Sequence, residues 1–231
     1  MDFSSKTIVV TGGTGALGSA VVGALLAAGA RCVVPYVHEA EMARFAHRAD
    51  KHMTLVAVRD LADEGDVGKL YAQAGSLWAS IHIAGGFAMG KVADTGKAAL
   101  MAQIDQNLVS CFLCCRAALK AFGGDGGRIV NVAARPALEW RSGVGMSAYA
   151  IAKSGVAVLT TTLAEEVAKD GILVNAVAPS IMDTPANRAA MPKADHAAWP
   201  KVEEVAATML FLASPANRVT RGAVVPVYGK S

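Results

Sequence analysis

The sequence predicts an α/β protein with a single Rossmann-type, doubly wound domain: a seven-stranded parallel sheet flanked by helices. Short β-branched runs alternate with longer helical patterns along the whole chain. The first of these runs leads directly into a glycine-rich turn and a helix, which is the usual start of such a fold. No repeat or linker divides the 231 residues, so we expect one domain over 1–231.

Composition and charge exclude several classes of protein. Apolar residues make up 53% of the chain and charged residues 18%, which is ample for a hydrophobic core. The net charge of +3 is scattered, with no basic run or acidic tail, so a nucleic-acid partner is not expected. No apolar stretch reaches the length of a membrane span, and residues 1–6 lack a signal-peptide core. We therefore expect a cytoplasmic protein with no membrane partner.

A dinucleotide-binding pattern occupies the N-terminal region. A β-branched run over 6–10 ends at the turn 11–18, TGGTGALG, and 19–28 has helical composition. Glycines let the backbone turn sharply and approach a pyrophosphate, and the helix N-terminus offers free N–H groups to it. The pattern predicts an NAD- or NADP-binding turn.

The next two strands leave the choice of cofactor open. The second strand, over 30–37, ends near Tyr36, where an acid would bind the ribose of NAD or a base the phosphate of NADP. Neither charge is present there, so the sequence does not decide between NAD and NADP. After the third strand, over 53–58, Asp60 is a candidate contact to adenine and equally a helix N-cap.

The rest of the chain continues the alternation and adds candidate substrate contacts. A fourth strand over 79–86 runs into a glycine turn, and Phe87 behind it is either a stacking surface for a planar substrate or an aromatic that closes the core. The polar, proline-bounded segment within 183–200 is expected to form a lid. We expect helices over 39–48, 67–74, 97–122, 147–169 and 202–213, a glycine break at 123–127, and strands over 128–133, 172–178 and 223–227.

The candidate catalytic pair is Tyr149 and Lys153, four residues apart in an apolar helical run. At this spacing both side chains leave the same face of the helix. A cation beside a phenol favours the phenolate, so we expect a lowered tyrosine pKa that suits acid–base catalysis. Asn107, in the middle of the long helix, needs partners such as a displaced carbonyl or a trapped water.

Three of the four cysteines, Cys111, Cys114 and Cys115, lie close together in an apolar helical pattern. Free cysteine serves there as a small hydrophobe, and neither a second C-x-x-C nor a nearby pair of histidines completes a tetrahedral site. The sequence therefore favours core or interface packing, and no metal site is predicted.

Taken together, the glycine turn, Asn107, Tyr149, Lys153 and the Ala178-Pro179 turn leading to Thr184 make the chain resemble the short-chain dehydrogenase/reductase family over essentially its whole length. Two stretches, 182–195 with Trp199 and 85–90, look like segments of dihydropteridine reductases within that family. The resemblance implies that Tyr149 is the general acid, that Lys153 lowers its pKa and binds the nicotinamide ribose, and that Asn107 holds a water. It also implies cofactor contacts at Gly12, Thr14, Gly15, Leu17, Gly18, Tyr36, Asp60, Ala84, Gly85, Tyr149, Lys153, Pro179 and Thr184, and it leaves Phe87, Asn187 and Trp199 as candidate substrate contacts.

Two of the chain's departures from the family pattern bear on catalysis. The Asn-Asn-Ala-Gly motif after the fourth strand reads His82-Ile-Ala-Gly85, and no hydroxyl stands in the segment 132–137, where the family has a catalytic serine. Ser142 and Ser147 lie nearer the tyrosine and are candidate substitutes, or ordinary loop and cap residues. The missing serine removes a donor that stabilises a developing alkoxide, and dihydropteridine reductases resemble this chain in lacking it.

These observations favour an NAD(P)H-dependent reductase of a planar, pterin-like small molecule. One alternative is a carbonyl or 3-oxoacyl reductase that uses Ser142 or Ser147, and another is a dinucleotide-binding regulatory protein with weak catalysis. The resemblance also implies a homodimer or homotetramer, for which the apolar face over 109–119 is a candidate surface.

Overall fold

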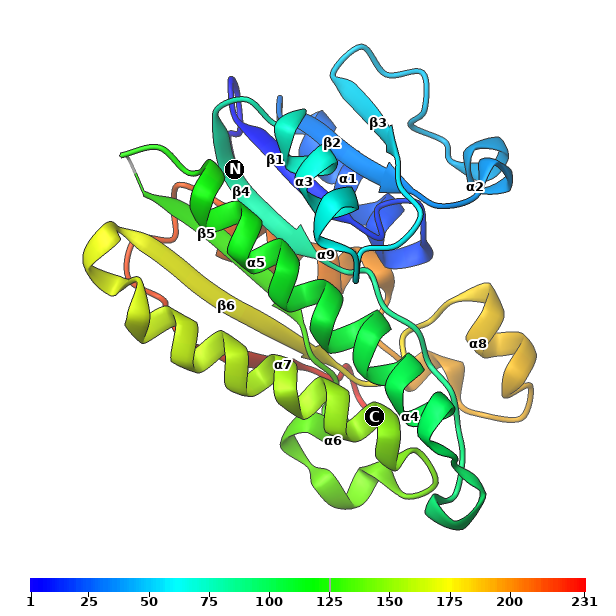
Figure 1. Ribbon diagram of the computed structural model, residues 1–231. Helices are drawn as coiled ribbons and strands as arrows, with labels where there is room; N and C mark the ends of the chain where they lie inside the picture. Colours follow the sequence, from blue (N-terminus) through cyan, green and yellow to red (C-terminus); the bar gives the residue numbers. More distant parts are fainter. Residues whose placement is uncertain (125) are drawn as a thin grey trace.

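The seven predicted strands form one parallel sheet in this computed structural model, which describes residues 1–124 and 126–231 (Figure 1). The strand order is β3-β2-β1-β4-β5-β6-β7, and every neighbouring pair is parallel. This arrangement confirms the predicted fold class. The strands are β1 (Thr7–Thr11), β2 (Arg31–Tyr36), β3 (Met53–Ala57), β4 (Leu77–His82), β5 (Gly127–Val132), β6 (Ile172–Pro179) and β7 (Val224–Val227).

Helices cover both faces of the sheet because successive strand residues point to opposite sides. Ile8 and Val10 pack into one hydrophobic cluster, and Val9 between them packs into another. The first cluster lies under α1 (Ala16–Ala27) and α9 (Val202–Ala213). The second lies under α3 (Glu64–Ala72), α5 (Ser110–Ala121) and α7 (Ser147–Glu166), of which α5 and α7 cross the front of Figure 1.

The long helix predicted over 97–122 is interrupted at its centre. α4 (Lys97–Ile104) and α5 are joined by a wide π-helical turn, Asp105–Val109. Taken as one helix, Lys97–Ala121 is long and apolar enough to cross a membrane by length and composition, so the prediction that no stretch reaches that length is wrong. A core helix passes the same test, and the cytoplasmic location stays a prediction.

The apolar residues of α5 pack inside the chain rather than on a free face. Leu113, Ala118 and the three cysteines of this helix are buried, whereas Phe112 is 51% exposed. The prediction that the face over 109–119 supplies an oligomer interface is therefore wrong for most of its residues, because they face the sheet.

Other boundaries differ from the prediction in ways that shape the site. β4 ends at His82, before the glycines, and α2 (Glu39–Arg44) is shorter than expected. The loop after β5 contains α6 (Arg135–Leu138) and a 3-10 turn, Trp140–Gly143, neither of which was predicted. The predicted break at 123–127 includes Asp125, which lies outside the described residues.

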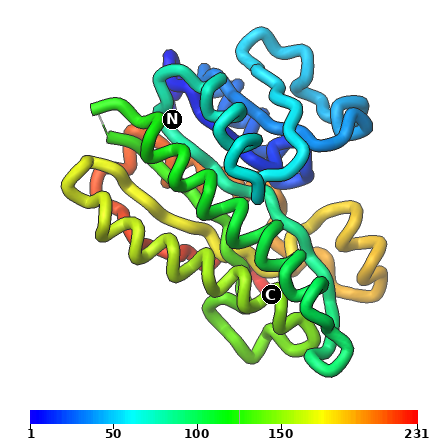
Figure 2. The backbone as a smooth tube through the Cα atoms, in the orientation of Figure 1, coloured from blue at the N-terminus to red at the C-terminus, as the bar shows by residue number. Residues whose placement is uncertain are grey.

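The predicted lid segment forms α8 (Pro185–Ala190) and a short 3-10 turn, His196–Ala198. An ion pair between Arg188 and Asp183 ties the start of the segment to α8, with 2.5 Å between nitrogen and oxygen. In Figure 2 this gold segment and the chain that leaves β4 lie beyond the same edge of the sheet, where the strands end. This carboxyl edge is where ligands bind in open α/β sheets.

Candidate active site

The glycine-rich turn packs directly against the end of β4. Gly12 has a φ of +68° and lies so close that a Cβ on it would come within 2.6 Å of the Ala84 nitrogen. A Cβ on Gly18 would collide with the carbonyl oxygen of Gly12. The Ala84 N–H also donates to the Thr11 hydroxyl at 3.3 Å. The glycines are therefore required by the close approach of two backbone segments.

The N-terminus of α1 fits the pyrophosphate of a dinucleotide. Gly15 is its N-cap, no side chain caps the helix, and the first turn holds no acid. The first N–H groups of the helix can therefore bind an anion, helped by the helix dipole. Leu17 is buried in the core, which leaves its backbone for any contact with the cofactor.

Sequence reasoning missed Glu41 at this site. The Thr14 hydroxyl donates to Glu41 Oε2 at 2.6 Å, and the N–H groups of Val37 and His38 donate to Glu41 Oε1. Partial burial alone would raise the pKa of Glu41, but these three hydrogen bonds bring it below its ordinary value. An ionised carboxylate thus lies between the glycine turn and the end of β2, where the sequence analysis found no charge.

The other two residues predicted near the adenosine end are exposed to different degrees. Tyr36 is half-buried, and its hydroxyl donates to Glu39 at 3.2 Å. Asp60 is exposed, and its carboxylate accepts the N–H of Ala62 at 2.8 Å. Asp63, and not Asp60, is the N-cap of α3, so the alternative role given to Asp60 is wrong.

Asn107 lies in the wide turn and holds the loop behind β4. Its Nδ2 donates to the carbonyl oxygens of Gln103 at 3.0 Å and of Gly86 at 2.9 Å. The π-helical turn frees the Gln103 carbonyl from its helical partner, which is the displaced carbonyl that the sequence analysis required. Among the described residues, the buried Oδ1 of Asn107 has no hydrogen-bond partner. This oxygen is therefore available to a water or a ligand.

Tyr149 and Lys153 lie on one face of α7, as their spacing predicts. The Lys153 ammonium is buried and donates to the carbonyl oxygen of Val132 at 2.8 Å, which anchors the helix to the end of β5. Its Nζ lies 6.0 Å from the centre of the Tyr149 ring. A Cβ on Gly85 would come 3.5 Å from this Nζ and would collide with Asn107 Oδ1, so Lys153 and Asn107 converge on one glycine.

The prediction of a lowered pKa for Tyr149 is wrong for the protein without bound cofactor. Burial raises the pKa of Tyr149 to about 12. Burial also lowers the pKa of Lys153 to about 8, because the charged form of each group loses solvation. The ammonium points toward the Val132 carbonyl, and at this position its attraction does not overcome the loss of solvation at the phenol. At neutral pH the pair is therefore a phenol beside an ammonium.

Phe87 lies against the catalytic tyrosine. The two rings meet edge to face, with 5.1 Å between centroids and 88° between planes. Phe87 is 59% exposed, so it does not close the core. The Gly90 N–H donates to the carbonyl oxygen of Gly145 at 2.8 Å, and this bond ties the Phe87 loop to the segment that enters α7.

No hydroxyl lies directly after β5. Ala133 and Ala134 are buried there, and Pro136 follows in α6. Of the two candidate substitutes, the Ser142 hydroxyl donates to the Glu139 carbonyl in an exposed turn. Ser147 is half-buried in the first turn of α7, two residues before Tyr149.

The residues predicted after β6 serve mainly to hold their own segment. Pro179 ends β6, and the buried Thr184 caps α8 by accepting the Asn187 N–H at 3.2 Å. The Asn187 side chain donates back to the Met182 carbonyl oxygen at 2.8 Å. Trp199 is buried and packs on His196, with 4.6 Å between ring centroids. The prediction that Trp199 offers a surface to substrate is therefore not supported.

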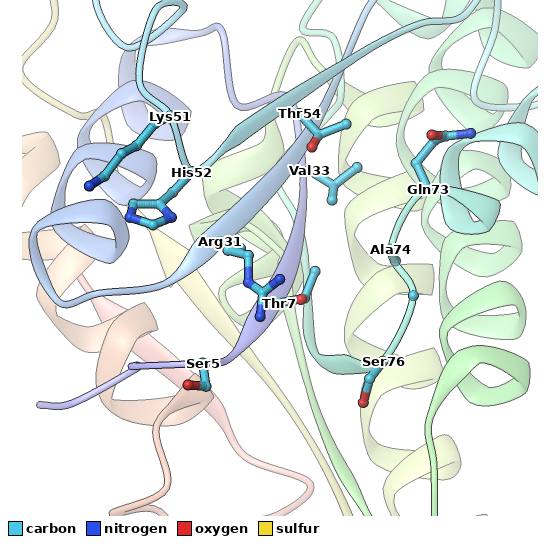
Figure 3. Close-up of a pocket in the computed structure, with 11 residues that line it drawn as sticks. Ser5, Thr7, Arg31, Val33, Lys51, His52, Thr54, Gln73, Ala74 and Ser76 are labelled. Carbon is cyan, nitrogen blue, oxygen red and sulfur yellow. The ribbon is translucent and has the colours of Figure 1, made fainter.

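A separate hollow of about 340 Å³ lies at the amino ends of the strands, opposite the candidate active site (Figure 3). Its walls include Thr7, Arg31 and Ser76, which stand at or just before the amino ends of β1, β2 and β4. The candidate active site is at the carboxyl ends of the strands, so this hollow is not part of it.

The chain belongs to the short chain dehydrogenase family, whose model matches residues 6–195. It is 31% identical to a 2,3-dihydroxy-2,3-dihydro-p-cumate dehydrogenase of Pseudomonas putida, over all of this chain (100%) and 96% of the relative. It is 30% identical to a 3-oxoacyl-[acyl-carrier-protein] reductase of Rattus norvegicus, over 78% of this chain and 76% of the relative.

A solved short-chain dehydrogenase/reductase from Mycobacterium ulcerans has the same fold, with a TM-score of 0.90 and 24% identity over 100% of this chain and 90% of that one. Family and fold together define an oxidoreductase of the short-chain dehydrogenase/reductase class.

Proposed function

We propose that this protein is an NAD(P)H-dependent reductase of a planar, conjugated, pterin-like molecule, with Tyr149 as the general acid. The observation that carries the proposal is the pair of half-buried Tyr149 and buried Lys153 next to a strand end that bears only the methyl groups of Ala133 and Ala134. The site offers a proton donor but no serine on the strand end beside it.

The side chains of this site divide the work of a reduction. When bound, NAD(P)H supplies the hydride. The glycine turn and the N-terminus of α1 would hold the pyrophosphate, and Lys153 would bind the nicotinamide ribose. The hydroxyl of Tyr149 is protonated at neutral pH and donates its proton to the substrate. Asn107 Oδ1 holds the water through which that proton is replaced.

A conjugated acceptor suits a site with one donor. In a simple ketone the hydride produces an alkoxide, and a missing hydrogen bond to it costs about 3–4 kcal/mol. In a quinonoid ring the charge spreads over several nitrogens, so one donor suffices. The exposed Phe87, edge-on to Tyr149, offers a flat surface on which such a ring can lie.

Steady-state oxidation of NADH and NADPH tests this proposal, with a quinonoid dihydropterin in one assay and an acetoacetyl thioester in the other. We expect turnover of the pterin, and a raised KM for it in a Phe87→Ala variant. Turnover of the thioester alone would contradict the choice of substrate. Tight cofactor binding with neither substrate reduced would favour the regulatory alternative.

Carbonyl chemistry is a second candidate, and the relatives favour it. The two relatives named above carry the names of a dihydrodiol dehydrogenase and a 3-oxoacyl reductase, so the pterin proposal depends on the site alone. Ser147 is the better placed substitute donor, because Ser142 is already engaged with Glu139. A large loss of ketone reduction in Ser147→Ala, with pterin inactive, would establish this candidate.

NAD is the proposed cofactor, on account of Glu41. Its carboxylate accepts a hydrogen bond from Thr14 in the glycine turn and two from the end of β2. This is the region that receives the adenine ribose in the family's fold. A carboxylate there can accept a hydrogen bond from a ribose hydroxyl, and it repels a phosphate on that hydroxyl.

Replacing Glu41 by Gln is expected to weaken the preference for NADH. Glutamine keeps the shape and an acceptor for Thr14 but removes the charge. We expect the ratio of kcat/KM for NADH over NADPH to fall roughly tenfold, equivalent to about 1.4 kcal/mol. Exposed Glu203→Gln in α9 is the control. An unchanged ratio in Glu41→Gln would rule out this role.

The proposal includes a homodimer or homotetramer in the cytoplasm. Phe112 on α5 and Ile151 and Val158 on α7 are each more than half exposed, although all three are apolar. Burial of such side chains is a common reason for subunits to associate. Analytical ultracentrifugation tests the proposal, and a monomer at assay concentrations would contradict it.

A further inference from the structure

A buried group of donors lies between α5 and the ends of β4 and β5. His82, Cys111 and Cys115 bring one nitrogen and two sulfurs within 4.8 Å of one another, and all three residues are buried. No histidine lies near these cysteines along the chain. The fold supplies His82 from a strand that is 29 residues or more away in sequence.

A fourth donor, Asn131 Oδ1, lies close to all three of these residues. It is 2.8 Å from His82 Nδ1, 3.4 Å from Cys111 Sγ and 3.6 Å from Cys115 Sγ. Cys115 Sγ is also 3.5 Å from His82 Nδ1. Zinc bonds to sulfur and nitrogen place neighbouring donors of a tetrahedral site roughly 3.3–3.8 Å apart. Three of these four distances already lie in that range, and the nitrogen–oxygen pair must widen.

From this geometry we propose that His82, Cys111, Cys115 and Asn131 form a buried Zn²⁺ site. Two thiolates, a neutral imidazole and an amide oxygen around a divalent cation give a complex with no net charge. A complex without net charge avoids most of the cost of burying an ion away from water. Thiolate and imidazole donors also favour zinc over magnesium or calcium.

The protons can be accounted for atom by atom. Without metal, His82 Nδ1–H donates to Asn131, and Nε2 accepts from Ser80 at 2.8 Å. Binding of Zn²⁺ releases one proton from each of the two thiols and leaves the imidazole neutral. The imidazole proton moves to Nε2, which then donates to Ser80. Ser80 in turn donates to the Tyr71 hydroxyl, which lies 2.6 Å from it in the structure. Each of these three side chains therefore keeps a hydrogen-bond partner.

The surrounding contacts hold these ligands in place. Asn131 Nδ2 donates to Thr160 Oγ1 on α7 at 2.9 Å, which fixes the direction of its amide oxygen. Cys111 and Cys115 lie one helical turn apart on α5 and face the same side. Asn131 directly precedes Val132, whose carbonyl binds Lys153. Occupancy of the site would therefore act on the residue next to the one whose carbonyl anchors the catalytic helix.

Metal content of the purified chain, without an affinity tag, tests the proposal. Protein expressed in medium with added zinc is analysed by inductively coupled plasma mass spectrometry, and protein expressed with cobalt by absorption spectroscopy. We expect about one metal ion per chain, and for cobalt the intense bands of a tetrahedral thiolate complex. The double variant Cys111→Ser/Cys115→Ser should lose both.

The matched control is Cys114→Ser, which alters a buried cysteine on the same helix that lies outside the group. It should bind as much metal as the unaltered chain. His82→Asn serves as a second ligand variant if the double variant fails to fold, as judged by circular dichroism. Equal metal content in the unaltered chain and a folded ligand variant would overturn the proposal, and so would absence of metal from the unaltered chain.

Discussion

Replacing Tyr149 by Phe is expected to reduce kcat about 10²–10⁴-fold, the usual contribution of a positioned general acid. The variant loses only the hydroxyl, and its ring can keep the edge-to-face contact with Phe87. Lys153 is bonded to the Val132 carbonyl and not to the phenol, so the cofactor site should keep its shape. Steady-state oxidation of NADH gives kcat, and a fluorescence titration gives the Kd for NADH.

The expected pattern is a large loss in kcat with an unchanged Kd. Tyr228→Phe is the control, because Tyr228 contacts Arg135 outside the catalytic pair and should turn over normally. Full turnover by Tyr149→Phe with cofactor bound would remove the tyrosine from the mechanism. Loss of NADH binding would instead mean that the hydroxyl is part of the cofactor site.

Local patterns in the sequence predict the part of the site that lies within one element or turn. The glycine turn, the Tyr149 and Lys153 spacing and the need of Asn107 for a displaced carbonyl all follow from short stretches of chain. Strand alternation places the ends of β1, β4 and β5 at one edge, so the approximate location of the site is predictable as well.

Contacts between distant segments account for what the sequence did not predict. Glu41 reaches Thr14 across 27 residues, and His82 reaches Cys115 across 33. The sequence does hold a sign of the Glu41 contact. A glutamate three residues after His38 suits a helix start, in which its side chain turns back toward the end of the preceding strand. Burial of Trp199 and of the Lys153 ammonium depends on the packing of whole elements, and a residue pattern does not report it.

The pH dependence of activity is the second large effect that we expect, and it follows from Lys153. Burial lowers the pKa of Lys153 to about 8, against an ordinary value of 10.5. The ammonium stabilises the negative charge that develops on Tyr149 as the proton leaves, so the neutral amine should be ineffective. We expect kcat for reduction to be flat below pH 8 and to fall about tenfold per pH unit above it.

A Lys153→Arg variant separates this cause from others. A guanidinium stays charged throughout the range, so the fall near pH 8 should disappear even though the absolute rate is lower. Lys120→Met, at an exposed position on α5, is the control and should keep the fall. A fall at the same pH in Lys153→Arg would mean that another group titrates.

The stability of the fold should respond to the same ionisation with the opposite sign. A folded pKa below the unfolded value means that the folded chain holds the ammonium at a cost in stability below pH 8, and that this cost disappears as pH rises from about 8 to 10.5.

Other groups also change stability in this range. Burial raises the pKa of the Cys32 thiol to about 12, and such buried thiols lower stability over part of the range. The stability of the unaltered chain must therefore be compared with that of Lys153→Met. That variant carries no ammonium. Urea titration gives the free energy of unfolding of both proteins, and any excess in the variant should shrink as pH rises from about 8 to 10.5. Activity that falls while this difference shrinks would trace both to one proton on Lys153, whereas a constant difference would mean that the lysine is not held at a lowered pKa.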